Sequence, residues 1–358
     1  MLPTAREEAR SSEGWSRSSG CRGCLYLTSN TSPFSCKPNL FEGTQYSSNH
    51  GACSVGPARI PAMPGPFKRH PPDKERGTSM SEAMKDGAKG TASNVYALDT
   101  GDAGAARLRL LDQVYGTSTR RMLSEAGLGK GSRVLDLACG IGAVSCWLAS
   151  EAGATGQVVA GDVNPDQLVV AKWHCARCEH PAPIQYLEVS AYGTGLPAES
   201  FDIVHMRLLL CHLTEPEKVL HEVHRILRPG GALVCQDLHL SSLYSVPESA
   251  AYSRIVELCL EMGRRLGVNY NFGINLPGAA VRAGFRAVEV RLDQPAYLRG
   301  EEKCLWEHTF AEVFPSMIRT GVASPDELQE LLQGMRAAAA DPRVLIAQAC
   351  LPGIIAVK

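Results

Sequence analysis

The stretch VLDLACGIGAVS, from Val134 to Ser145, limits the possible folds of this 358-residue chain more than any other part of the sequence. Its first four residues are typical of a buried strand, and a helical pattern follows. Gly140 and Gly142 fall in the turn between them, where the missing side chains let the backbone approach a ligand closely. The stretch therefore predicts a strand, a tight turn and a helix, with a ligand bound at the turn.

Short apolar runs alternate with amphipathic helical patterns through the rest of the chain. Seven runs are typical of strands: RVLDLAC, QVVAGDV, IQYLEV, FDIVHM, GALVCQDL, AVEVRL and GIIAVK. Strands interleaved with helices are the pattern of an α/β protein. We therefore expect a Rossmann-like, doubly wound, parallel sheet of seven strands with helical lid insertions.

Two helix starts can be predicted residue by residue. Thr214 and Glu217 form a capping box before an apolar series, and the Pro-Gly-Gly at 229–231 is expected to end that helix. Ser324 is followed by a proline and then by Glu327, which predicts an N-cap, a proline at the first helical position and the box glutamate. The second of these helices is expected between the sixth and seventh strands.

Composition excludes several classes of partner. The formal net charge is −1 and the pI is about 6.8, so no overall charge attracts the chain to nucleic acid or to an anionic membrane. No stretch reaches the roughly 18 to 20 apolar residues of a membrane helix. Thirteen scattered cysteines, several in apolar stretches, favour free thiols in a reducing, cytoplasmic setting. We expect a small-molecule partner and a monomer or homodimer.

The residues around the glycine turn favour a ligand without phosphates. A dinucleotide site requires a third glycine where Ser145 stands, with a pyrophosphate at the helix N-terminus. Asp136 places a carboxylate in the strand ahead of the turn, which suits a cationic ligand better. A dinucleotide-dependent oxidoreductase is therefore the weaker alternative.

From about Tyr96 to Lys358 the chain resembles the class I S-adenosylmethionine-dependent methyltransferases, in particular the small-molecule branch that includes quinone-biosynthesis C-methyltransferases. The resemblance rests on ordered motifs: VLDLACGIGAVS, GDVNPDQL, LEVSAYGTGLP, SFDIVHMRLLLCHL and LRPGGALVCQDL. It implies S-adenosylmethionine as the cofactor. It also implies methyl transfer to a small organic acceptor, for which we favour oxygen over nitrogen or carbon.

The resemblance further implies where the cofactor binds. Asp136 is expected near the cofactor's amino group through a water molecule, and Asp162 is expected to bind both ribose hydroxyls. Ser190 stands where the family usually has an acid facing adenine, so we expect the backbone of Ala191 to help there. The implied cofactor-binding residues are Asp136, Ala138, Gly140, Gly142, Asp162, Val163, Gln167, Ser190, Ala191 and Arg207.

The first part of the chain differs in composition from the rest. Residues 1–90 are rich in Ser, Gly and Pro and lack periodicity, so we interpret them as a disordered or dispensable extension. An organellar targeting peptide is the alternative, against which the acidic residues in REEAR argue. Residues 91–358 are then the methyltransferase-like domain. It divides into an N-terminal helical segment over 95–130, a cofactor-binding core over 131–240, and acceptor-side helices with the last strands over 241–358.

Candidate catalytic residues follow from the chemistry of methyl transfer. Displacement at a sulfonium mainly requires alignment and exclusion of water, and histidine is the side chain best suited to act as a base near neutral pH. His212 and His239 follow the fourth and fifth strands, at the edge where ligands bind in such sheets. Local packing or solvent exposure is the alternative for each. A non-catalytic regulator that keeps only the cofactor site is a further alternative.

Two other clusters have a plain structural alternative. HCARCEH, at 174–180, carries thiols and imidazoles, but zinc needs four donors and no second pair follows at a fitting distance. We therefore expect a solvated helix face and no metal. The segments 241–277 and 297–343 carry aromatic residues that predict an apolar lid over the acceptor, with ordinary core as the alternative. Trp306, Phe310 and Phe314 recur there at helical spacing.

Overall fold

The computed structural model describes Leu98 and residues 102–358. The segment proposed as a dispensable extension, residues 1–90, lies outside this described part. The helices are α1 (Asp102–Glu125), α2 (Ala143–Ala152), α3 (Pro165–Cys175), α4 (Pro216–Ile226), α5 (Ala250–Leu266), α6 (Leu276–Arg282), α7 (Leu305–Thr320) and α8 (Pro325–Ala340). Short 3-10 helices are η1 (Leu210–His212), η2 (Leu240–Ser242), η3 (Phe272–Ile274) and η4 (Glu301–Cys304).

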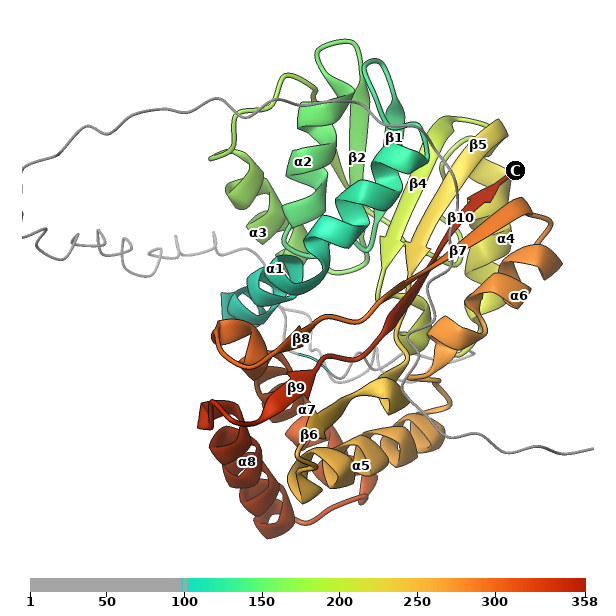
Figure 1. Cartoon of the computed structure of the whole chain (residues 1–358). Helices are drawn as coiled ribbons and strands as arrows, with labels where there is room; N and C mark the ends of the chain where they lie inside the picture. Colours follow the sequence, from blue (N-terminus) through green and yellow to red (C-terminus); the bar gives the residue numbers. More distant parts are fainter. Residues whose placement is uncertain (1–97, 99–101) are drawn as a thin grey trace, which may run out of the picture. The chain divides into compact units, whose positions relative to one another are not determined.

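A seven-stranded sheet forms the centre of the domain, with the order β3-β2-β1-β4-β5-β10-β7 (Figure 1). Its strands are β1 (Arg133–Leu137), β2 (Gln157–Asp162), β3 (Ile184–Glu188), β4 (Phe201–Arg207), β5 (Leu227–Gln236), β7 (Arg286–Asp293) and β10 (Leu351–Val357). All seven expected strands are present. The chain adds β2 and β3 on one side of β1 and then β4 and β5 on the other, and this switch in strand order places a ligand crevice at the carboxyl ends of β1 and β4.

The last strand departs from the expected parallel pattern. β10 runs antiparallel to both β5 and β7, whereas β1 to β5 pair in parallel. A parallel pair requires a crossover element that packs on the sheet. The helices between β7 and β10, α7 and α8, instead pack against α5 and against each other. The chain therefore re-enters the sheet at the end where β7 left it, and β10 runs antiparallel to β7.

Successive residues of β1 belong to two cores, one on each face of the sheet. Val134 packs with Met122 of α1 and Leu148 of α2, while Leu135 packs with Val219 of α4. Both Val134 and Leu135 are fully buried. Helices therefore cover both faces, as expected for a doubly wound fold (Figure 1).

A second, smaller sheet supports the lid. It consists of β6 (Tyr244–Val246), β9 (Leu345–Ala347) and β8 (Ala296–Tyr297), in that order. Helices α5, α7 and α8 pack together beside it. Helices α7 and α8 lie within 297–343, where helices were expected. The small sheet was not predicted, because strands of two or three residues are too short to show an alternating pattern.

Of the two helix starts predicted from the sequence, one is confirmed and one is wrong. The hydroxyl of Ser324 accepts a hydrogen bond from the Glu327 N–H at 3.2 Å, so the predicted cap of α8 is confirmed. The capping box at Thr214 is wrong, because α4 starts at Pro216 with Glu215 as N-cap and no side-chain cap bond. Proline favours the first helical position and so fixes this start.

The end predicted for α4, at the Pro-Gly-Gly of 229–231, lies beyond the end that the structure shows. The helix ends at Ile226 and β5 begins at Leu227, so the Pro-Gly-Gly at 229–231 lies inside the strand. The pairing of β4 with β5 is irregular between Phe201 and Ile203, opposite this segment. Proline and glycine are tolerated in strands at such irregular positions.

Candidate functional site

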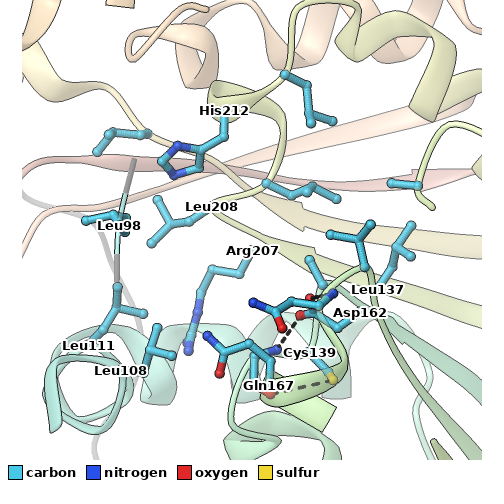
Figure 2. Close-up of a pocket in the computed structure, with 18 of the residues that line it drawn as sticks. Leu98, Leu108, Leu111, Leu137, Cys139, Asp162, Gln167, Arg207, Leu208 and His212 are labelled. Carbon is cyan, nitrogen blue, oxygen red and sulfur yellow. Dashed lines mark hydrogen bonds between the residues drawn. The ribbon is translucent and has the colours of Figure 1, made fainter. Parts of the chain in front are cut away.

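A single cavity of about 1010 Å³ opens at the carboxyl ends of β1, β2 and β4. Ten of the twelve predicted site residues line it: Asp136, Ala138, Gly140, Asp162, Val163, Gln167, Ser190, Ala191, Arg207 and His212. Gly142 and His239 do not. Figure 2 shows Asp162, Cys139 and Gln167 close together, with Arg207 beside them and His212 further away, beyond Arg207.

Asp162 ends β2 and holds the turn that follows β1. Its carboxylate accepts hydrogen bonds from the N–H groups of Gly140 and Asn164, each at 3.0 Å. Burial raises the pKa of Asp162, while these backbone N–H groups act in the opposite direction. A carboxylate has about four lone-pair positions, so this one can still accept bonds from ligand hydroxyls.

The glycine turn contains three residues in the left-handed region. Ala138, Gly140 and Gly142 have φ angles of 62°, 53° and 74°. A Cβ on Gly142 would lie 3.0 Å from the sulfur of Cys175, so this glycine lets the turn pack against α3. A Cβ on Gly140 would meet only Leu108, at 3.6 Å, from the opposite wall of the cavity. Gly140 is therefore the glycine that keeps the ligand side open.

Asp136 is bound on both sides by protein groups. It is 2% exposed, the Ser145 hydroxyl donates to one oxygen at 2.5 Å, and His205 Nδ1 lies 2.7 Å from the other. Direct strand pairing brings Asp136 and His205 together, because they are register partners in β1 and β4. Sequence reasoning missed this pair and treated Ser145 only as a departure from a dinucleotide motif.

Two buried polar atoms at this end of the cavity have no hydrogen-bond partner among the described residues: Nε2 of His205 and Oε1 of Gln167. Because Nδ1 is bonded to Asp136, Nε2 is the ring nitrogen of His205 that is left for a ligand. Unsatisfied buried acceptors are costly, so such atoms mark places where a ligand supplies donors. An adenosyl cofactor carries hydroxyl and ammonium donors, and the residues present therefore fit it.

Arg207 is the buried cation between the two ends of the cavity. Its guanidinium donates to Thr119 at 3.0 Å and to Asp112 at 3.2 Å, both on α1. Burial lowers the pKa of Arg207, while the charge of Asp112 raises it. These contacts tie β4 to α1 and hold the side chain in one position.

The two candidate histidines differ in position. His212, at the end of η1, lines the cavity, and its ring packs edge-to-face on Tyr270 with 5.6 Å between centroids. His239 lies outside the cavity and pairs with Cys350 through an isolated bridge. Burial, followed by the charge of Arg107, lowers the pKa of His212 to about 4. His212 is therefore neutral at pH 7, which makes it a hydrogen-bond partner and only a weak base.

This lowered pKa predicts an acid-sensitive stability. The His212 ring titrates near 6.5 when unfolded and near 4 when folded, so between these values the unfolded chain binds more protons and stability falls as pH falls. From pH 7 to pH 5 we expect this group to remove about 1 to 2 kcal/mol, after allowing for partial exposure. Urea unfolding of wild type and His212→Gln at both pH values measures the difference, and equal losses would contradict the prediction.

The HCARCEH segment makes local contacts. Cys178 donates to the His174 carbonyl at 3.7 Å, His180 Nδ1 lies 2.9 Å from the Ala182 carbonyl, and Cys175 donates to the Gly142 carbonyl at 3.4 Å. Within residues 102–358, no three His, Cys, Asp or Glu side chains are grouped so as to hold a metal ion. No helix of that same part is long and apolar enough to cross a membrane.

Known proteins match the part of the chain that forms the cofactor end of the cavity. Residues 135–235 match the family described as "Methyltransferase domain". This match, together with the similar proteins below, supports a class I S-adenosylmethionine-dependent methyltransferase domain over these residues. The motif order found in the sequence and the sheet order agree with this assignment, and the cofactor of the class is S-adenosylmethionine.

Similar proteins match only part of this chain. The ubiquinone/menaquinone biosynthesis C-methyltransferase of Pseudoalteromonas translucida is 32% identical over 135 residues, which are 38% of this chain and 51% of that one. That of Escherichia fergusonii is 32% identical over 127 residues, 36% and 50% of the two chains. The chain thus spans about half the length of these relatives. The solved phosphoethanolamine N-methyltransferase 2 of Haemonchus contortus has a TM-score of 0.45 at 19% identity, covering 71% of this chain and 58% of that one.

Proposed function

We propose that this protein transfers a methyl group from S-adenosylmethionine to the hydroxyl oxygen of a small, largely apolar acceptor. The observation that carries this proposal is the single cavity that joins the glycine turn to the lid. One end is lined by Asp162, Gly140 and Gln167, and the other by Trp306 and Phe310 of α7. A cofactor and an acceptor held end to end in such a space are positioned for an in-line transfer.

We assign the cofactor end as follows. Asp162 binds the ribose hydroxyls, Gly140 leaves room for the backbone to approach, and Ser190 with Ala191 faces adenine. His205, oriented by Asp136, accepts a hydrogen bond from the cofactor's ammonium group. The water-mediated contact to Asp136 that the sequence resemblance implied is compatible with this bond, because each Asp136 oxygen has one protein partner and keeps a further lone pair.

At the acceptor end the chain contributes positioning and exclusion of water. The bound cofactor supplies a methyl group on a positively charged sulfur. Leu305, Phe310 and Val313 form an apolar wall, which excludes water from the reacting atoms. His212, neutral at pH 7, accepts a hydrogen bond from the acceptor hydroxyl and orients its oxygen toward the methyl group.

Methylation of a ring carbon is the second candidate. Two of the similar proteins are C-methyltransferases by name, which favours this reaction. Both reactions release a proton, but a phenolic hydroxyl can lose its proton to water before transfer. A ring proton lost after carbon methylation instead needs a base at the site, and a histidine with a pKa of about 4 is a poor one. This difference leads us to favour oxygen.

Purified protein incubated with S-adenosylmethionine and a panel of phenols, quinols, amines and carboxylic acids tests the proposal. We expect S-adenosylhomocysteine release with hydroxyl compounds, and product spectra locate the methyl group on oxygen or carbon. Cofactor binding without release for any acceptor would instead support the non-catalytic regulator.

A lid variant tests whether α7 forms part of the acceptor site. Trp306 and Phe314 are 6% and 8% exposed, but only Trp306 lines the cavity. Trp306→Ala is expected to raise the acceptor KM about tenfold or more while cofactor affinity stays within about twofold, because only acceptor binding is removed. Phe314→Ala is the matched control, which should lower the melting temperature and leave the acceptor KM unchanged. Loss of cofactor binding in Trp306→Ala would place this residue in the core alone.

A further inference from the structure

The lid end of the cavity contains one buried charge in an apolar surrounding. We define the acceptor wall as the cavity-lining residues of α1, η1 and α7: Arg107, Leu108, Leu111, Tyr115, His212, Leu305, Trp306, Thr309, Phe310 and Val313. Among these described residues Arg107 is the one with a formal charge at pH 7, since His212 is neutral there. An isolated charge in such a wall is unfavourable unless it has a partner.

Only part of the Arg107 guanidinium has a partner. Its Nε donates to the Glu312 carboxylate at 2.7 Å, and the two side chains are 3% and 12% exposed. Its Nη2 is buried and has no hydrogen-bond acceptor among the residues that the structure describes. Glu312 does not line the cavity, so it anchors the guanidinium from behind the wall. A guanidinium carries five N–H donors, so this ion pair leaves donors available.

The charge of Arg107 reaches the position we assign to the acceptor. It is one of the two causes that lower the pKa of His212, so the guanidinium and the imidazole lie within electrostatic range of each other. No carboxylate belongs to the acceptor wall. The wall therefore combines apolar surface with a positive charge whose carboxylate partner, Glu312, lies behind it.

We propose that Arg107 recognises an anionic oxygen on the acceptor, so that the preferred acceptor is an apolar ring compound carrying a carboxylate or an ionised hydroxyl. This inference rests on the proposed function, because it takes the lid end of the cavity as the acceptor site. Arg107 acts here as a specificity residue. Guanidinium groups bind anionic oxygens through strong, charge-assisted hydrogen bonds.

Binding of three matched probes to the protein saturated with S-adenosylhomocysteine tests this inference by calorimetry. The probes are naphthoate, a nitronaphthol that is ionised at about pH 7, and the neutral naphthamide. Arg107→Gln is expected to weaken binding of at least one of the two anionic probes about tenfold or more, because charged hydrogen bonds are lost. Binding of the neutral naphthamide is expected to weaken less than about twofold. The anion that shows the larger loss identifies the acidic group, carboxylate or hydroxyl.

Two further variants separate recognition from stability. Glu312→Gln breaks the same ion pair but keeps the positive charge, so we expect it to retain the preference for the anionic probe. Arg107→Lys keeps the charge without the planar fork and should restore part of the preference. The proposal would be overturned if Arg107→Gln and Glu312→Gln each weakened the binding of all three probes by the same factor. It would also be overturned if Arg107→Gln bound every probe as tightly as wild type does. A probe preference without methyl transfer to any acceptor would contradict the proposed function alone.

Discussion

Replacing Asp162 by alanine is expected to weaken binding of S-adenosylhomocysteine by about 1.5 to 3 kcal/mol, or roughly ten- to hundredfold. The variant loses the carboxylate that we assign to the ribose hydroxyls. It also loses the acceptor that holds the N–H groups of Gly140 and Asn164, so the glycine turn is less well ordered before the ligand arrives. Isothermal titration calorimetry measures the change.

Asp166→Ala is the matched control for this prediction. Asp166 lies four residues further on, is exposed at the start of α3, and does not line the cavity. We expect its loss to leave the affinity within about twofold, as is usual for a surface substitution. An unchanged affinity in Asp162→Ala would remove Asp162 from the cofactor site.

Asp136→Ala is expected to cause the largest loss of stability, about 2 to 4 kcal/mol, because it leaves the buried Nδ1–H of His205 without an acceptor. It also removes the acceptor for the Ser145 hydroxyl. Ser145→Ala removes one of the two bonds and leaves the carboxylate in place, so we expect it to cost only about 1 kcal/mol. Urea unfolding at pH 7 measures both values. Equal costs for the two variants would show that the pairing of Asp136 with His205 contributes little.

The sequence was sufficient to predict the strands and the cofactor turn, because both depend on local pattern. The apolar run before Gly140 and the acid at the end of the next strand are visible within about thirty residues of each other. The direction of β10 was not visible, since its composition is that of any buried strand. Its antiparallel pairing depends on where the lid helices pack, which is a property of the tertiary structure.

The unpredicted parts of the candidate site join residues that are distant in sequence. Asp136 and His205 are 69 positions apart and meet only through the register of β1 and β4. Arg107 and Glu312 are 205 positions apart and meet only where the lid closes on α1. One sequence without tertiary contacts contains no signal for either pair.

The same limit applies to the candidate histidines. His212 and His239 each follow a strand end, so the sequence offered equal grounds to predict a catalytic role for both. The structure separates them, because the chain after β5 turns into a bridge with Cys350 and takes His239 away from the cavity, whereas η1 keeps His212 on its wall.

A crystal structure of the protein bound to S-adenosylhomocysteine tests the assignment of the cavity most directly. We predict one molecule at the glycine turn, with its ribose hydroxyls on Asp162, a donor within hydrogen-bond distance of His205 Nε2 and of Gln167 Oε1, and its sulfur directed toward the α7 end of the cavity. Electron density for the ligand elsewhere, or a ribose that makes no contact with Asp162, would contradict this assignment.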